Sequence, residues 1–321
     1  MAALHDLLPE GTLRKVWWMT HSLQSPSLTH LLEAKPIPPR QMGAEARTTV
    51  AMIFMSSGTT GRPKGVMLSH TSLIMPYICN RYLMSLIEGG NLVMKMVYQA
   101  ALIILPLHHM YGYAIMMNTI FFGGTAILLP NFSPKKFFKT IEEFKITLCP
   151  LVPHIANFLS ETPLLHQYDI SSIIGFNSAA APISPVTLST VKEKTGKGFG
   201  TTYGMTEAAV ICSNNERLGF KPGAVGRVFP HSQVKVVDTE SGQMLAEGQE
   251  GEVCVQGPNR MLGYINDPKA TAAAIDVDGW LHTGDLGYYD QDNFLFLTDR
   301  SRDIIKVKGL QGEDAGNGDQ I

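Results

Sequence analysis

The sequence predicts an α/β protein in which mostly parallel sheets carry helices on both faces, joined to a small antiparallel β subdomain. From residue 46 to about 213, strand-like runs alternate with helix-like runs, and this alternation favours a parallel sheet covered by helices. After Gly219, short runs of alternating polar and apolar residues are separated by Gly and Asp turns, as in antiparallel hairpins. Hydrophobic residues make up 45% of the 321 residues, so the chain can bury a substantial core.

Start signals support the order of the predicted elements. Ser133-Pro134 and Ser184-Pro185 each combine an N-cap residue with a proline suited to the first helical turn. Ser69 is the expected cap of an earlier helix. The expected strands are 49–54, 101–105, 125–129, 147–149, 173–177, 199–203, 233–237, 252–256 and 294–297, and the expected helices begin at 69, 113, 133, 153 and 184.

Changes of character along the chain suggest its organisation. The expected parts are a partial first α/β subdomain over 1–95 with a glycine-rich loop at 55–66, a second α/β subdomain over 96–218, the small β subdomain over 219–298, a hinge over 299–311 and a disordered tail over 312–321.

Composition excludes several classes of protein. A net charge of −2 gives no electrostatic reason for nucleic-acid binding. The stretch between Lys95 and Lys135 lacks charged residues, but Pro106 and Gly123-Gly124 interrupt it, so we expect no membrane span. The 4 cysteines are far apart and are expected to be reduced, buried thiols. No targeting signal is visible, and we expect a cytoplasmic or peroxisomal protein.

The run from 55 to 66 is the strongest local signal for a ligand. It contains hydroxyl residues, glycines and two cations, in the order Ser56, Ser57, Gly58, Thr59, Thr60, Gly61, Arg62, Pro63, Lys64 and Gly65. Glycines let backbone N–H groups turn toward a phosphate, and a lysine can neutralise phosphate charge. Pro63 stands where the usual NTPase phosphate loop requires its second glycine, so the run is a different phosphate loop. A flexible surface linker is the alternative.

Four further segments accompany this loop, at 106–112, 202–207, 282–287 and 299–309. Together the runs resemble, in order, the signature motifs of the adenylate-forming enzymes, which include acyl-CoA synthetases, coumarate–CoA ligases and firefly luciferases. The resemblance extends from about residue 12 to residue 311. It implies the large domain of that family, in incomplete form, and a family that uses ATP, Mg²⁺ and CoA on a small-molecule carboxylic acid.

The resemblance also implies roles for individual residues. His109, Thr206 and Glu207 are the implied catalytic residues, and Glu207 is the implied ligand of the magnesium ion. The implied contacts to ATP or AMP are Ser56, Ser57, Gly58, Thr59, Thr60, Gly61, Lys64, Ala179, Ala180, Ala181, Pro182, Thr202, Tyr203, Gly204, Met205, Thr206, Asp285 and Arg300.

Simpler interpretations exist for three of these positions. Glu207 fits an exposed glutamate at a helix start, where the helix dipole favours it. Asp285 fits a turn former in a Thr-Gly-Asp turn. His109 fits a buried structural histidine, and its pairing with His108 also raises a zinc site, although adjacent residues cannot easily face one ion.

The function implied is that of an acid–thiol ligase: ATP-dependent conversion of a carboxylic acid to an acyl-adenylate and then to an acyl-CoA, as in coumarate–CoA ligases. We expect impaired activity in this chain, because nothing after residue 311 resembles the family's C-terminal domain with its catalytic lysine. A non-catalytic fragment that binds ATP, AMP or acyl-adenylate and a luciferase-like monooxygenase are the alternatives. An unpaired sheet edge near 49–54 would favour self-association.

Overall fold

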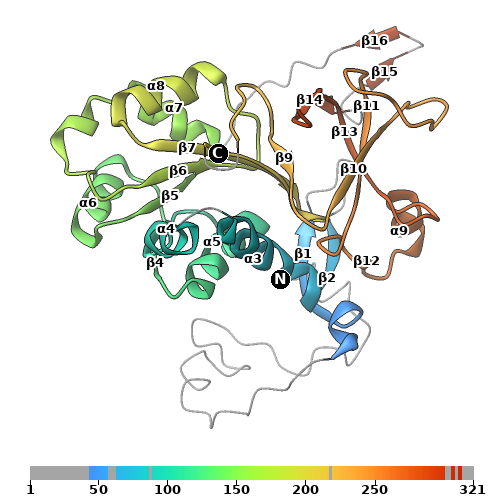
Figure 1. Ribbon diagram of the computed structural model, residues 1–321, viewed down its shortest axis with the longest axis horizontal. Helices are drawn as coiled ribbons and strands as arrows, with labels where there is room; N and C mark the ends of the chain where they lie inside the picture. The colour runs from blue at the N-terminus through green and yellow to red at the C-terminus, as the bar shows by residue number, and fades with distance from the viewer. Residues whose placement is uncertain are drawn as a thin grey trace.

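The computed structural model describes residues 43–56, 63–86, 89–216, 219–300, 305–307 and 310–312 (Figure 1). A seven-stranded sheet in the order β4-β3-β5-β6-β7-β8-β9 dominates the fold. Its strands are β3 (Ala100–Ile103), β4 (Thr125–Leu128), β5 (Leu148–Leu151), β6 (Gly175–Ser178), β7 (Gly198–Met205), β8 (Ala209–Asn214) and β9 (Arg227–Val228). The pairs from β4 to β7 are parallel, and β8 and β9 add antiparallel strands. The predicted α/β class is therefore confirmed.

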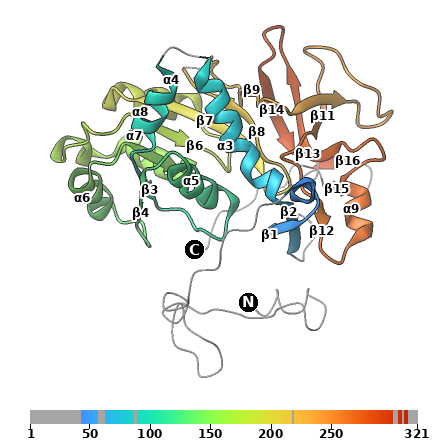
Figure 2. The same ribbon diagram turned by 60° about the horizontal axis from the view of Figure 1, so that its bottom comes forward.

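Helices cover both faces of this sheet, and Figure 2 shows α3 and α5 in front of it. The helices on this sheet are α3 (His70–Ser85), α4 (Gly90–Val97), α5 (Met110–Phe121), α6 (Pro134–Phe144), α7 (Pro153–Glu161) and α8 (Pro185–Thr195). A further helix, α9 (Pro268–Ala274), lies beside strands of the later part of the chain, and 3₁₀ turns lie at Ala44–Arg47 and Pro163–Gln167. Side chains of β3 alternate between two cores, since Leu102 packs with α6, α7 and α8 while Ile103 packs with α3, α4 and α5.

The predicted start signals act as expected in two helices. Ser69 Oγ accepts a hydrogen bond of 3.0 Å from Ser72 N at the start of α3. Ser184 Oγ accepts one of 3.2 Å from Val186 N, ahead of Pro185 in the first turn of α8. Ser133 precedes α6 without a capping hydrogen bond from its side chain, so the proline signal alone marks that start.

A hairpin contains a strand that the sequence analysis did not predict, β2 (Lys64–Ser69), between the glycine-rich loop and the helix capped by Ser69. β1 (Val50–Ser56) pairs antiparallel with β2, and β2 also pairs with β12 (Gly263–Tyr264). The loop thus joins two strands, and α3 begins only after the second. β1 lies at one edge of this three-stranded sheet, and only its Phe54 is fully buried.

The later part of the chain forms the predicted antiparallel unit. Its sheet has the order β10-β11-β13-β14, with β10 (Gln233–Val237), β11 (Gly251–Gln256), β13 (Leu281–Tyr289) and β14 (Leu295–Arg300). Two short strands, β15 (Ile305–Val307) and β16 (Leu310–Gly312), pair separately. Asp285 lies within β13 instead of in a turn between elements, because it pairs with Arg300 of β14. A bulge interrupts the pairing with β11 at this point, between the Cys254–His282 and Glu252–Leu286 pairs, and Gly284 has a φ of 74°.

A shared core joins the three larger sheets. It contains Leu68 from β2, Ile211 from β8, Val253 from β11 and Leu281 from β13, all nearly inaccessible to solvent. The three sheets therefore pack against one another, and residues from all three can reach one site. The predicted subdomain boundaries remain predictions, since β9 continues the large sheet and β12 completes the first small one. Among the described residues, no helix is long and apolar enough to cross a membrane.

Truncation of Phe138 should be costly. The Phe138 ring is fully buried in α6 and stacks on Tyr168 at a centroid distance of 5.4 Å. Phe138→Ala should lower the free energy of unfolding by about 3–5 kcal/mol, measured by urea denaturation. Phe144→Ala on the same helix is the matched control, because Phe144 is 52% exposed. Equal losses in the two variants would contradict this packing.

Candidate nucleotide site

The carboxyl ends of β6 and β7 bring two predicted segments together. The strands run in parallel, with Ser178 paired to Thr201, so the segments that follow them leave the sheet at one edge. The buried Ala179 follows β6, and the exposed residues Ala180, Ala181 and Pro182 come next in the chain. Thr202 of β7 is half-buried. Ala180 has a φ of 75°, which reverses the chain sharply after the strand. Small exposed side chains at such an edge leave room for a flat ring, and parallel sheets commonly bind ligands there.

A hydrogen-bonded network connects this edge to the segment 106–112. Tyr111 Oη donates to Asn177 O at 2.9 Å and to Asn177 Oδ1 at 3.0 Å. Asn177 Nδ2 donates to Thr202 Oγ1 at 3.2 Å. Burial raises the pKa of Tyr111 well above its usual range, so the phenol remains a donor. Sequence reasoning missed Asn177, because nothing in a single strand residue indicates which neighbours it connects.

A tight turn after β7 places Glu207. A Cβ on Gly204 would lie 1.8 Å from Ala209 O, so only glycine allows β7 and β8 to approach this closely. Glu207 follows in the turn between β7 and β8 and is 7% exposed, which excludes the exposed helix-start glutamate as an interpretation.

Tyr264 of β12 holds the Glu207 carboxylate. Its Oη donates to Glu207 Oε1 at 2.9 Å, and Met261 N donates to Glu207 O at 2.7 Å. The Lys64 ammonium lies 5.1 Å from the centre of the Tyr264 ring, within range of a cation–π contact. One aromatic side chain thus contacts both a cation of the predicted phosphate loop and the predicted magnesium ligand. Sequence reasoning did not identify Tyr264, since no local signal relates it to either residue.

Asp285 lies on β13 and is 5% exposed. Tyr203 Oη donates to Asp285 Oδ2 at 2.6 Å, and Asp285 N donates to Thr283 Oγ1 at 3.1 Å. Burial first, and the Asp285 charge second, raise the pKa of Tyr203 well above its usual range. Tyr203 is therefore a neutral donor to a carboxylate, and the bond joins the predicted adenine segment to the predicted ribose segment.

Arg300 is the register partner of Asp285 on β14. The two residues that the resemblance assigns to ribose therefore lie opposite each other on neighbouring strands. Strand pairing brings the two residues together, although the β13–β14 turn separates them in the sequence.

His109 is an exposed helix cap rather than a buried structural residue. Its Nδ1 accepts a hydrogen bond of 3.2 Å from Tyr111 N at the start of α5. Partial burial of the ring and the neighbouring His108 lower the pKa of His109. Within the described part of the chain, the residue groups able to hold a metal ion do not include His108 or His109.

Part of the predicted site lies outside the described residues, namely Ser57, Gly58, Thr59, Thr60 and Gly61. Ser56 and Lys64 mark the two ends of that segment, as register partners on β1 and β2. The described residues bring together the segments that contain Lys64, Ala180, Thr202, Glu207 and Asp285.

Removal of the Tyr264 hydroxyl should destabilise the fold. Tyr264→Phe deprives the buried Glu207 carboxylate of a donor, which should cost about 1–3 kcal/mol of unfolding free energy in urea denaturation. Tyr82→Phe on the exposed face of α3 is the control, because Tyr82 is 50% exposed. If both variants unfold like the parent protein, the hydrogen bond does not support Glu207.

His109 should make stability depend on pH. A histidine whose pKa is lowered in the folded state binds its proton more readily when unfolded. Its contribution is therefore complete above the unfolded pKa of about 6.5 and falls as the pH drops below that value. His109→Asn keeps a capping side chain but cannot titrate, so its denaturation midpoint should change less with pH over this range. Superimposable pH profiles of the two proteins would contradict this role.

Comparison with known proteins agrees with this geometry. The family described as "AMP-binding enzyme" matches residues 4–265, which is more than half of the chain. A 4-coumarate–CoA ligase of Pinus taeda is 38% identical over 273 residues, covering 82% of this chain and 49% of that protein. A luciferin 4-monooxygenase of Photinus pyralis is 36% identical over 264 residues, covering 82% of this chain and 47% of that protein. The chain therefore spans about half the length of these curated relatives.

Solved structures show the same fold. The ATP-bound MatB of Rhodopseudomonas palustris superposes with a TM-score of 0.76 at 29% identity, covering 89% of this chain and 55% of MatB. The amide bond synthetase McbA of Marinactinospora thermotolerans gives a TM-score of 0.75 at 30% identity, covering 97% of this chain and 60% of McbA. The resemblance drawn from the motifs is confirmed: the chain belongs to the family of AMP-binding, adenylate-forming enzymes.

Proposed function

We propose that this chain provides the nucleotide-binding part of an ATP-dependent enzyme that activates a carboxylic acid as an acyl-adenylate, ahead of transfer to CoA. The observation that supports this proposal best is the buried hydrogen bond of 2.6 Å between Tyr203 and Asp285, which joins the predicted adenine segment to the predicted ribose segment. A bound ATP structure of MatB and an AMP complex of a Bacillus subtilis MenE support a nucleotide at this site.

The nucleotide is proposed to lie along the edge formed by β6, β7 and β13. Ala180 and its small neighbours after β6, with Tyr203 and Gly204 of β7, form the adenine side. Asp285 and Arg300 accept and donate hydrogen bonds at the ribose. Lys64, with Ser56 and the residues between them, contacts the phosphates, where hydroxyls and backbone N–H groups hold the departing pyrophosphate in line.

Glu207 is the proposed ligand of Mg²⁺. Hard oxygen donors suit this ion, which usually takes one or two carboxylates together with substrate phosphates. The Glu207 carboxylate suits this ion, because the Tyr264 hydroxyl bonds to only one of its two oxygens, Oε1, and fixes the orientation of the Glu207 side chain. A bound Mg²⁺ ion would neutralise phosphate charge during attack by the carboxylate. Thr206, beside Glu207, is the accompanying hydroxyl.

The acid is proposed to approach from the side of His109. His109 Nδ1 caps α5, so Nε2 is the ring nitrogen left to meet an anionic substrate. Relatives named 4-coumarate–CoA ligase favour an aromatic acid and an acid–thiol ligase over the luciferase-like monooxygenase reading. Binding of nucleotide without turnover is the second candidate, and its motivation is that the contacts of Tyr203 with Asp285 and of Tyr264 with Glu207 lie among residues assigned to the nucleotide and its ion.

Calorimetry with ATP and Mg²⁺ tests the nucleotide site directly. We expect binding by the unmodified chain and weakening of at least about tenfold, or 1.4 kcal/mol, in Asp285→Asn. Asparagine preserves an acceptor for Tyr203 but removes the charge that binds both ribose hydroxyls. Asp278→Asn, an exposed aspartate on the loop before β13, is the control.

Exchange of pyrophosphate into ATP in the presence of 4-coumarate separates the two candidates. Exchange shows adenylation by this chain, whereas binding without exchange favours the nucleotide-binding role. Absence of both binding and exchange in a folded sample overturns the proposed function.

A further inference from the structure

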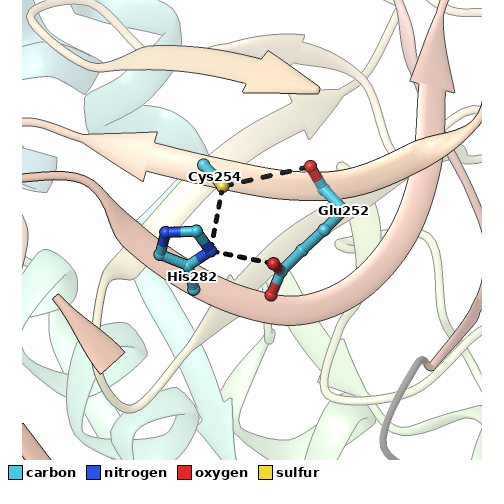
Figure 3. Close-up of side chains that lie close together, drawn as sticks. All are labelled: Glu252, Cys254 and His282. Carbon is cyan, nitrogen blue, oxygen red and sulfur yellow. Dashed lines mark hydrogen bonds and ion pairs between the residues drawn. The ribbon is translucent and has the colours of Figure 1, made fainter. Parts of the chain in front are cut away.

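A second cluster of chemically active side chains lies on the four-stranded sheet, apart from the proposed nucleotide contacts. It consists of Glu252 and Cys254 from β11 and His282 from β13 (Figure 3). Glu252 and Cys254 are two residues apart in a strand, so their side chains share a face. Cys254 is the register partner of His282, which brings the ring to the same face.

The donor atoms are close enough to surround one ion. His282 Nδ1 lies 2.8 Å from Glu252 Oε2 and 3.5 Å from Cys254 Sγ, and the three donor atoms lie within 4.8 Å of one another. Tetrahedral zinc sites hold oxygen and nitrogen at about 2.0–2.2 Å and sulfur at about 2.3 Å from the ion, which places the donor atoms about 3.3–3.8 Å from one another. Only small movements of the side chains would admit an ion.

Further contacts orient two of the three donors. Gly284 N donates to Glu252 Oε1 at 3.1 Å, which leaves Oε2 directed at the cluster. On the far side of the imidazole, His282 Nε2 lies 3.7 Å from Asp276 Oδ2. Asp276 is itself anchored by Trp280 N, which donates to Oδ1 at 2.8 Å. A carboxylate behind the histidine and a hydrogen bond to the ligating carboxylate are typical of protein metal sites.

We propose that Glu252, Cys254 and His282 form a binding site for a zinc-class divalent ion that links β11 to β13. The thiol and imidazole favour zinc over magnesium or calcium, which prefer oxygen donors. The Glu252 and His282 side chains are 19% and 31% exposed, so an ion can enter from solvent, while Cys254 lies buried beneath them. Three protein donors leave a fourth position for water.

The proposal is independent of nucleotide binding, although the same strand serves both. β13 contains His282 and, three residues later, Asp285. An ion that bound only the folded chain would stabilise it, and the pairing of β11 with β13 would be reinforced beside the ribose residues. Without an ion, His282 Nδ1 lies at hydrogen-bond distance from Glu252 Oε2, beside the Cys254 thiol.

Titration of the chelator-treated chain with Co²⁺, followed by competition with Zn²⁺, tests the site. Cobalt bound by a thiolate gives a near-ultraviolet sulfur-to-metal charge-transfer band, and four-coordinate cobalt gives intense visible bands. We expect both to appear and to saturate at one ion per chain, and Zn²⁺ should abolish them.

Variants identify the donors. Cys254→Ser should remove the charge-transfer band, and Glu252→Gln, which keeps an acceptor for Gly284, should weaken Zn²⁺ binding by at least about tenfold. Asp276→Asn should weaken it by about 10–100-fold through the histidine. Cys79→Ser is the matched control, because Cys79 is a buried thiol whose contact is with Pro230 O.

The result is decisive either way when circular dichroism shows that the variants are folded. Loss of the band in Cys254→Ser with retention in Cys79→Ser supports the site. Absence of the band in the parent chain, or a band that persists in Cys254→Ser, overturns it.

Discussion

The buried hydrogen bond from Tyr203 to Asp285 is the interaction on which the proposed site depends. It connects β7 of the large, mostly parallel sheet with β13 of the antiparallel sheet, two strands that no backbone pairing joins among the described residues. A hydrogen bond to a charged group contributes about 1.5–3 kcal/mol, and loss of the donor would leave a buried carboxylate poorly solvated. The bond therefore contributes to the stability and the alignment of the junction.

Apolar packing around this bond explains why the alignment is rigid. Leu68, Ile211, Val253 and Leu281 come from separate strands and lie in one continuous core. Interiors packed to this degree transmit displacement instead of absorbing it, so a shift of one sheet would move its neighbours. The polar residues that face the junction are consequently held in place by side chains that never meet a ligand.

A second polar connection links the first hairpin to the same junction. Tyr264 contacts Lys64 through its ring and Glu207 through its hydroxyl. The contacts pair a cation, an aromatic face and a carboxylate, so opposite charges lie near each other without a direct ion pair. This arrangement limits the mobility of both charged groups.

Local patterns in the sequence were sufficient to predict much of the fold. Ser69 and Ser184 cap the helices that they were expected to cap, because a capping hydrogen bond spans only two or three residues. Strand-like runs such as 101–105, where the structure has β3 over Ala100–Ile103, are apolar enough to be recognised without partners. The glycine-rich run, the Glu207 segment and the Asp285 segment likewise carry their residue types in a recognisable order, and from these the family could be identified.

Only the tertiary structure decided how those elements pair and which side chains meet. β2 becomes a strand because β1 and β12 supply its hydrogen bonds, and Asp285 lies in a strand because it pairs with Arg300 of β14. Tyr264 reaches Glu207 across 57 positions of sequence, and Tyr203 reaches Asp285 across 82. The sequence by itself determined the type and order of elements and motifs, since these depend on neighbouring residues. The contacts that build the site depend on strand pairing and burial between distant segments, and no local pattern encodes them.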